Sequence, residues 1–393
     1  MPTISDVSDV WLNAQDIDLA QLSALVSRQT SLAAVPLAVD IVANVPVYTG
    51  ALVADAGQDE ERYQALAAEW HRVLSDGAGA IVIRGAWDTE LIDQVSLVFE
   101  QILAEEATAG IASGDHFAKT GANARVWNAH EKLAVRAPEA FIDYNTNETL
   151  AMASLAWLGP LYRVTAQLNL VRPGGQAQEP HRDYHMGFQP AELLARFPYQ
   201  SHRLSAALTL QGAVAHVDMP LASGPTQLLP YSQLWPPGYL VKGRAEVDAV
   251  FAKHRIQIEL RKGDALFFNP ALLHAAGDNQ TADIERLANL LQISAAWGRT
   301  MEVVDSVRIA RHVYPALLER VQSNALDAKA VERVIAASVD GYAFPANLEL
   351  EPPRGHLPPA SQQDLLRESL RQGWTAERLD DALCAQQALK RSC

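Results

Sequence analysis

The stretch EPHRDYHMGF, residues 179–188, holds the side chains with the clearest capacity for metal chemistry. His181 and Asp183 are separated by one residue, so on a strand or extended segment their side chains point to the same side of the chain. An imidazole nitrogen and a carboxylate oxygen could then reach the same metal ion. The alternative is a polar turn in an acidic protein, because a His-x-Asp pattern occurs often by chance.

A third ligand must come from elsewhere, and KGDALFFNPALLHAAGDN, residues 262–279, supplies one. Its first three residues indicate a tight turn, 265–269 is expected to be a buried strand, and His274 follows where the chain leaves the sheet. Two histidines and one carboxylate on one face of a metal leave three adjacent coordination positions open. That arrangement is typical of non-haem Fe(II) oxygenases, whereas zinc hydrolases more often use His-rich tetrahedral sites.

Short strands must position these ligands. YRVTAQLNLV, residues 162–171, alternates strictly, and the face that carries Gln167 and Asn169 is polar. Such a face predicts a lined cavity rather than a solvent-exposed surface. Further strands are expected at 203–211, 226–230, 255–260, 265–269 and 286–297, separated by Gly- and Pro-rich turns. The pattern predicts an antiparallel barrel or jelly roll.

Helices are expected on both sides of these strands. Apolar spacing predicts helices at 59–76 and 88–106, with Asp88 as an N-cap and a short strand at 80–85 between them. The Gly- and Asn-rich segment 110–130 is interpreted as a long loop. After about residue 305 the chain becomes helical again, and Ser361 and Asp364 have the spacing of a capping box.

The order of four motifs makes the sequence similar to a known family. AQLNLVRPGG with HRD, then SGPTQLLPYSQ, then KGDALFFNPALLHAAGDN and then ERLANLLQIS resemble the phytanoyl-CoA dioxygenase family of Fe(II)/2-oxoglutarate oxygenases. LSDGAGAIVIRGAWDTELID resembles the family's opening helix, strand and helix, and the resemblance covers roughly residues 65–300. It implies a mainly β fold, a double-stranded β-helix (a jelly-roll or cupin-like barrel) with N- and C-terminal helical extensions.

The resemblance also implies roles for individual residues. The family's three Fe(II) ligands correspond to His181, Asp183 and His274, and 2-oxoglutarate and O2 are the implied co-reactants. Arg286 corresponds to the arginine that pairs with the distal carboxylate of 2-oxoglutarate, a role suited to an always-charged bidentate donor. Asn169 corresponds to a position that hydrogen-bonds the cosubstrate, and Gln167 shares its face of the strand.

Substrate contacts are expected close to these ligands and from segment 110–130, which could close over the site as a lid. The candidates are His185, His116, Lys119, Arg125 and Trp127. A second copy of the ligand pattern, His216-Val217-Asp218, lies where the family has a loop leaving the barrel. We therefore do not expect this copy to bind the metal.

Three regions follow: an N-terminal extension over 1–60, a dioxygenase domain over 61–305 with its barrel core at about 150–300, and a helical C-terminal extension over 306–393 packed on the barrel. The expected activity is Fe(II)- and 2-oxoglutarate-dependent hydroxylation of an unactivated C–H bond in a small molecule, with release of succinate and CO2. The alternative is a cupin-like metal-binding protein or isomerase that does not use 2-oxoglutarate. Because Asp183 is present, a related halogenase, which has a small residue there, is not expected.

Composition limits the remaining possibilities. The 393 residues carry a net charge of −14, which argues against a nucleic-acid or anionic-membrane surface. The two cysteines, Cys384 and Cys393, cannot form a disulfide framework, and the N-terminus lacks the basic and apolar regions of a signal peptide. We expect a cytoplasmic enzyme, a monomer or homodimer, that acts on a small-molecule substrate.

Overall fold

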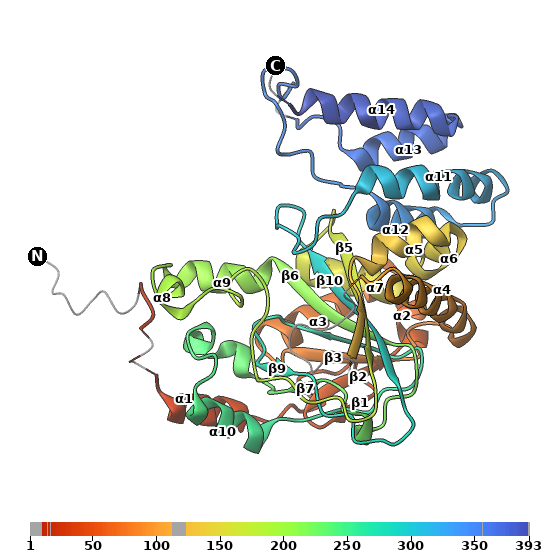
Figure 1. Cartoon of the computed structure of the whole chain (residues 1–393). Helices are drawn as coiled ribbons and strands as arrows, with labels where there is room; N and C mark the ends of the chain where they lie inside the picture. The colour runs from red at the N-terminus through yellow and green to blue at the C-terminus, as the bar shows by residue number, and fades with distance from the viewer. Residues whose placement is uncertain (1–9, 14, 16, 112–122, 356, 392–393) are drawn as a thin grey trace, which may run out of the picture.

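An eight-stranded sheet is the central element of the protein (Figure 1). The structure is a computed structural model that describes residues 10–391 except 14, 16, 112–122 and 356. In spatial order the strands are β1 (Asp40–Val42), β2 (Val45–Thr49), β3 (Ala80–Arg84), β8 (Ala265–Phe268), β6 (Thr209–Ala215), β10 (Arg286–Ser294), β5 (Arg163–Val171) and β4 (Asn123–Val126). Neighbouring strands are antiparallel except β2 and β3, which are parallel.

A smaller second layer faces this sheet. It contains β7 (Gln227–Leu228) paired with β9 (His274–Ala275), and isolated bridges add His181 beside His274 and Ile256 beside Leu228. The two layers do not join into a closed barrel, but a large sheet with a short opposing layer is a jelly-roll arrangement. The predicted fold class is therefore confirmed.

Strict alternation along the strands divides their side chains between two environments. On β3, Ala80 and Val82 face the space between the layers, whereas Ile81 and Ile83 pack under the helices. On β5 the apolar residues also pack under the helices, and Gln167 and Asn169 line a cavity on the opposite face, as the sequence predicted.

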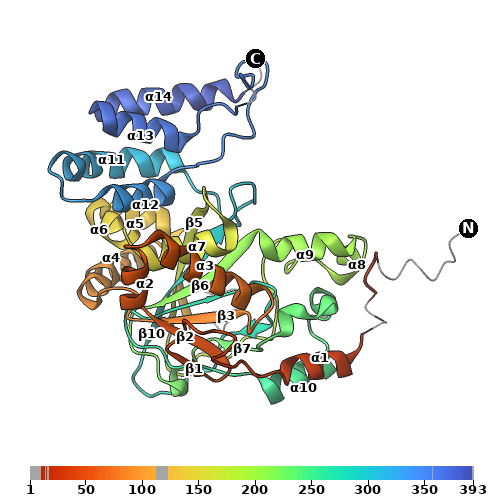
Figure 2. The same cartoon turned by 180° about the vertical axis from the view of Figure 1, so that it is seen from behind.

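Helices cover the outer face of the large sheet (Figure 2). They are α2 (Gly50–Ala56), α3 (Glu60–Ser75), α4 (Thr89–Thr108), α5 (Ala129–Arg136), α6 (Pro138–Asn145) and α7 (Glu148–Leu158). The Asp88 carboxylate accepts hydrogen bonds from the backbone N–H groups of Glu90 and Leu91, so it is the expected N-cap of α4. The other elements that precede the C-terminal region are α1 (Leu19–Val26), α8 (Ala191–Leu194), α9 (Tyr199–Ala207), α10 (Ala245–His254), η2 (Leu221–Ser223), η3 (Ser232–Leu234) and η4 (Pro236–Tyr239).

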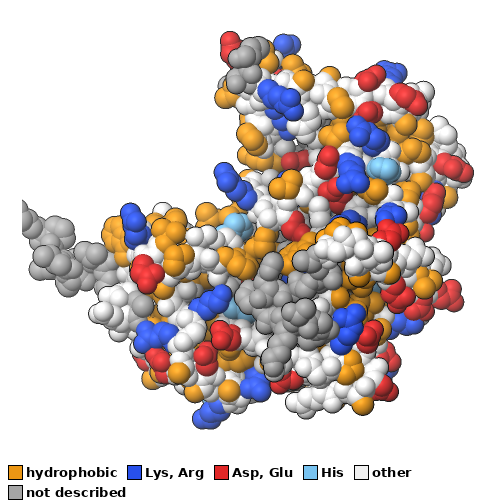
Figure 3. All heavy atoms as spheres, in the orientation of Figure 1, with side chains coloured by type: hydrophobic (Ala, Val, Ile, Leu, Met, Phe, Trp, Pro, Cys, Tyr) orange, Lys and Arg blue, Asp and Glu red, His pale blue; other side chains and the backbone are white. Residues whose placement is uncertain are grey.

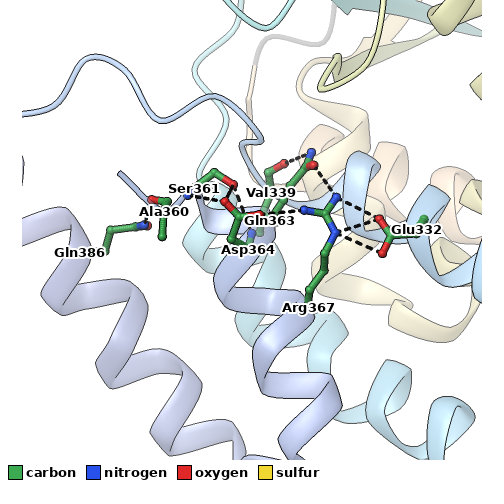
Figure 4. A network of polar contacts seen from close by, with 8 residues as sticks. All are labelled: Glu332, Val339, Ala360, Ser361, Gln363, Asp364, Arg367 and Gln386. Atoms are coloured by element: carbon green, nitrogen blue, oxygen red, sulfur yellow. Dashed lines mark hydrogen bonds and ion pairs between the residues drawn. The ribbon is translucent and has the colours of Figure 1, made fainter. Parts of the chain in front are cut away.

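The C-terminal region is a stack of four helices, α11 (Ser306–Gln322), α12 (Ala328–Ser338), α13 (Gln362–Gln372) and α14 (Ala376–Leu389). α11 and α12 rest on α6, and α13 and α14 lie farther from the sheet (Figure 1). Ser361 and Asp364 form the expected capping box of α13, and Arg367 ties that helix to Glu332 of α12 at 2.9 Å (Figure 4). On the face seen in Figure 3, acidic and basic side chains are interspersed over this stack.

Three expected elements differ from the structure. The segment 203–211 is not one strand, because α9 occupies it as far as Ala207 and β6 begins at Thr209. Residues 255–260 form only isolated bridges, through Ile256 and Leu260. The predicted loop 110–130 contains β4, whose backbone pairs with β5.

The first 60 residues supply two strands of the large sheet, because β1 and β2 continue it beyond β3. Within the described part of the chain, no helix combines the length and apolar character that crossing a bilayer requires.

Candidate metal centre

His181, Asp183 and His274 converge at the smaller layer, with one potential ligand atom from each within 4.8 Å of the others. The two histidines are direct partners in an antiparallel bridge: His181 N–H donates to the His274 carbonyl at 3.0 Å, and His274 N–H donates back at 3.1 Å. This pairing places their rings together, with centroids 4.5 Å apart. Asp183 N–H donates to the Pro270 carbonyl at 3.1 Å, which fixes the third ligand to the same neighbouring segment.

The backbone also orients both imidazole rings. His181 Nδ1 lies 2.7 Å from the Glu179 carbonyl, and His274 Nδ1 lies 2.8 Å from the Leu272 carbonyl. A carbonyl oxygen can only accept, so each Nδ1 carries the proton and each Nε2 keeps a lone pair. The two Nε2 atoms lie 3.6 Å and 3.5 Å from the Asp183 carboxylate oxygens.

The local electrostatics favour the protonation states that metal ligands need. Burial, followed by the nearby His274, lowers the pKa of His181, so its imidazole is neutral near pH 7. Burial alone would raise the pKa of Asp183, but the adjacent His274 and His181 and a hydrogen bond from Gln211 hold that pKa well below its usual range. Two imidazole nitrogens and one carboxylate therefore fit a divalent metal ion such as Fe(II).

A cavity of about 680 Å³ opens beside the three ligands. Its walls combine carboxamide and charged groups with apolar side chains, among them Phe188, Met219, Leu290 and Met301. A cavity of this size accommodates a cosubstrate together with a small organic molecule.

Arg286, the first residue of β10, lies inside this cavity and is only 5% exposed. Its Nη1 donates to the carbonyls of Ser223 at 3.1 Å and Gly277 at 3.3 Å, and within the described ranges no carboxylate pairs with it. Burial lowers the pKa of Arg286 to about 10, so it remains charged at neutral pH. The preceding residue, Glu285, faces outward and pairs with Arg172 at 3.2 Å.

Four other expected site residues line the cavity: Asn169, Gln167, Arg125 and Trp127. Arg125 Nη1 donates to Gln167 Oε1 at 2.9 Å, and its guanidinium lies 4.9 Å from the centre of a Trp127 ring. Asn169 Oδ1 is buried without a hydrogen-bond partner in the described part of the chain. Arg125 comes from β4, Gln167 and Asn169 come from β5, and Trp127 directly follows β4, so Arg125 belongs to a paired strand rather than to a lid.

Of the remaining substrate candidates, the described residue His185 is not brought into the cavity. His185 Nε2 lies 3.2 Å from the Arg299 carbonyl, and the side chain does not line the cavity wall. Tyr184 and His185 have φ values of 64° and 45°, so the chain turns sharply after the ligand Asp183. His116 and Lys119 lie outside the described residues.

Sequence reasoning missed several residues of the site, above all Gln211 and Gln292. Gln211 Nε2 donates to Asp183 Oδ2 at 2.5 Å, and Gln292 lies beside Gln211 on the adjacent strand. Alternation along 286–294 could have assigned Gln292 to the face of Arg286, since both are even-numbered positions of one strand. Alternation also separates Gln211 from the apolar Leu208 and Leu210, but nothing in the sequence indicated that its face meets Asp183.

The second His-x-Asp copy is structural. His216 is buried, and its Nδ1 lies 2.8 Å from Ser96 Oγ, while Asp218 accepts a hydrogen bond from Lys262 N–H at 2.9 Å. Burial lowers the pKa of His216 to about 3. Across the described residues, only His181, Asp183 and His274 form a group able to hold a metal ion.

A jelly roll that brings two histidines and one carboxylate together is typical of the class of non-haem Fe(II) oxygenases. The sequence matches the family model of phytanoyl-CoA dioxygenase over residues 75–288, more than half of the chain, and the protein belongs to that family. Its cofactors are accordingly Fe(II), 2-oxoglutarate and O2, and the ligand set found here fits the iron.

Solved structures show limited similarity to the chain. The α-ketoglutarate-dependent epimerase SnoN from nogalamycin biosynthesis is 20% identical, with a TM-score of 0.41 over 61% of this chain and 82% of that one. The carbocyclase SnoK from the same biosynthesis is 19% identical, with a TM-score of 0.42 over 60% and 86%. AviO1 from Streptomyces viridochromogenes Tue57 is 18% identical, with a TM-score of 0.42 over 59% and 95%. No curated protein sequence matches significantly.

Proposed function

We propose that the protein is an Fe(II)- and 2-oxoglutarate-dependent dioxygenase that hydroxylates an unactivated C–H bond of a small molecule. One C–H bond of the substrate becomes C–OH, O2 supplies one oxygen atom to that hydroxyl and one to succinate, and 2-oxoglutarate loses CO2. The bound iron with O2 and 2-oxoglutarate supplies the oxidising power for this step.

The observation that carries the proposal is the buried charge of Arg286 in the cavity that also contains the ligand triad. A buried guanidinium without a carboxylate partner is unfavourable unless an anionic ligand pairs with it. Two backbone carbonyls satisfy part of its hydrogen-bonding capacity, but neither neutralises its charge. A dicarboxylate cosubstrate would provide that charge.

The proposed roles of the protein side chains follow from their chemistry. His181, Asp183 and His274 would hold the iron on one side, leaving its other side to the cosubstrate and O2. Arg286 would pair with the distal carboxylate of 2-oxoglutarate, and Asn169 would hydrogen-bond the same molecule. The apolar groups of the cavity would exclude water, which limits the loss of oxidising equivalents to solvent.

A cupin-like metal protein that does not use 2-oxoglutarate would need the same three ligands but not Arg286. Anaerobic addition of 2-oxoglutarate to the Fe(II) protein separates the two functions, because chelation of the iron by the 2-oxo acid produces a visible charge-transfer band. We expect the band in wild type. Its absence, with Fe(II) binding retained, would rule out the dioxygenase.

The product test uses succinate formation together with mass spectrometry of the converted substrate. A gain of one oxygen atom, labelled from 18O2, is expected for hydroxylation. Loss of two hydrogens, with succinate still formed, would assign desaturation or ring closure instead. Candidate substrates are those small molecules that raise the rate of 2-oxoglutarate consumption.

A further inference from the structure

Three carboxamide side chains lie side by side on the cavity face of the large sheet. Gln167, Gln292 and Gln211 come from the adjacent strands β5, β10 and β6, and all three line the cavity. Gln211 and Gln292 are direct cross-strand partners. Gln167 is paired with Leu290, which places it diagonally next to Gln292 on the same face.

The hydrogen bonds fix the direction of each amide. Arg125 can only donate, so the atom of Gln167 that receives its hydrogen bond at 2.9 Å must be the oxygen. The nitrogen of Gln167 then faces the oxygen of Gln292 at 3.4 Å. At the other end an ionised carboxylate can only accept, so the atom of Gln211 that lies 2.5 Å from Asp183 must be the nitrogen.

These assignments leave one donor, on Gln292, and one acceptor, on Gln211, without a partner in each other's direction. Gln292 has its amide nitrogen available for a hydrogen bond, and Gln211 has a buried oxygen that no described residue satisfies. A nitrogen donor and a carbonyl acceptor therefore lie on neighbouring positions of adjacent strands. Small rotations of the two side chains would join them and remove the unsatisfied group.

We infer that Arg125, Gln167, Gln292 and Gln211 form a directional hydrogen-bond chain that ends on Asp183, and that Gln211 is a positioning residue for this metal ligand. Every member donates toward Asp183. Gln211 engages the carboxylate oxygen Oδ2, which is also the oxygen facing His274. With that oxygen held, the carboxylate binds metal in one defined orientation. Gln292 prevents the Gln211 amide from rotating by half a turn, which would exchange its nitrogen and oxygen.

The inference rests on the proposed iron site but is tested without turnover. Gln211→Met retains the length of the side chain and removes its hydrogen bonds. Co(II) serves as the probe, and its visible absorption gives both the dissociation constant and the coordination geometry. We expect Gln211→Met to weaken Co(II) binding about 10- to 100-fold, the usual effect of losing a group that orients a ligand. The absorption spectrum should also change, because the freed carboxylate can bind through both oxygens.

Thr165→Val is the matched control. Thr165 is buried on β5 directly opposite Gln292, and its hydroxyl donates to the Gln292 backbone carbonyl at 2.8 Å. The substitution is nearly isosteric and removes one hydrogen bond to Gln292, but it leaves the proposed hydrogen-bond chain of side-chain amides intact. Co(II) affinity and spectrum should remain those of wild type. Unfolding of each apo protein, followed by circular dichroism, verifies that every variant is folded.

A double-mutant cycle tests whether the chain extends beyond Gln211. Gln292→Met should weaken Co(II) binding about 3- to 10-fold in wild type, and should have no further effect in the Gln211→Met background, since the connection to Asp183 is already lost. An equal effect of Gln292→Met in both backgrounds, or no effect in either, would overturn the chain. Unchanged affinity and spectrum in Gln211→Met would overturn the positioning role. Failure of wild type to bind Co(II) would instead count against the proposed iron site itself.

Discussion

Replacing Arg286 with methionine should abolish tight binding of 2-oxoglutarate while leaving metal binding in place. Arg286 is 5% exposed and has no carboxylate partner in the described part of the chain, so its pairing with the cosubstrate would be fully desolvated. Removing one partner of a buried, hydrogen-bonded charge pair costs about 2–5 kcal/mol. At about 1.4 kcal/mol per factor of ten, the dissociation constant for 2-oxoglutarate should rise about 30- to 4000-fold.

The assay is an anaerobic titration of the Fe(II) protein with 2-oxoglutarate, read through the charge-transfer band, together with succinate formation at saturating O2. Arg286→Lys preserves the charge but not the bidentate geometry, so its effect should be smaller, about tenfold. Arg172→Met is the control, because Arg172 belongs to the same region but is paired with Glu285 at the surface.

The substitution also removes two hydrogen bonds to the carbonyls of Ser223 and Gly277 together with a buried charge, so the free energy of unfolding must be measured in parallel. Equal affinity for 2-oxoglutarate in wild type and a folded Arg286→Met protein would refute the reasoning. So would an equal loss in Arg172→Met.

Three further outcomes are expected. Fe(II) or Co(II) should raise the melting temperature of wild type but not of His274→Ala, because a ligand that binds only the folded state stabilises it. An equal rise in both proteins would show that the metal binds elsewhere. Ser361→Ala should lower the free energy of unfolding by about 1 kcal/mol through loss of the α13 cap, with Co(II) affinity unchanged. Burial lowers the pKa of His216 to about 3, so below about pH 6.5 this imidazole takes up a proton in the unfolded state but not in the folded state. The free energy of unfolding should therefore fall as the pH drops below about 6.5. His216→Gln should make this decline shallower between pH 6.5 and 4 in urea titrations, and an unchanged slope would contradict the assignment.

The spacing of the candidate metal ligands is visible in the sequence, but a His-x-Asp pattern alone is common by chance, and the order of the four motifs favoured a metal site over a turn. His181 and Asp183 have the spacing that places two side chains on one side of an extended chain, and His274 follows a clear turn and strand. Strand β5 was equally clear, since its strict alternation separates a polar from an apolar face along nine residues. The role of Arg286 came from resemblance rather than from pattern, and it remains a prediction.

Other features depend on contacts that a sequence pattern does not encode. The segment 203–211 combines helix formers with alternating apolar residues, and the packing of α9 beside β6 decides where the helix ends and the strand begins. Strands β1 and β2 are short: β2 is a strand because it pairs with the edge of β3, and β1 because it pairs with β2. The contact between Gln211 and Asp183 joins two segments that meet only after the sheet has formed.

The segment that connects β10 to α11 places Met301 in the cavity wall, and the neighbouring Glu302 accepts a hydrogen bond from Asn128 N–H at 2.6 Å. The C-terminal helices are therefore joined to the large sheet through a piece of chain that also forms part of the cavity wall. Truncating the protein after β10 would remove that wall along with the helices. Substitutions in this connection offer a way to alter which molecules fit without touching a metal ligand, so substrate range can diverge while the chemistry at the iron site is retained.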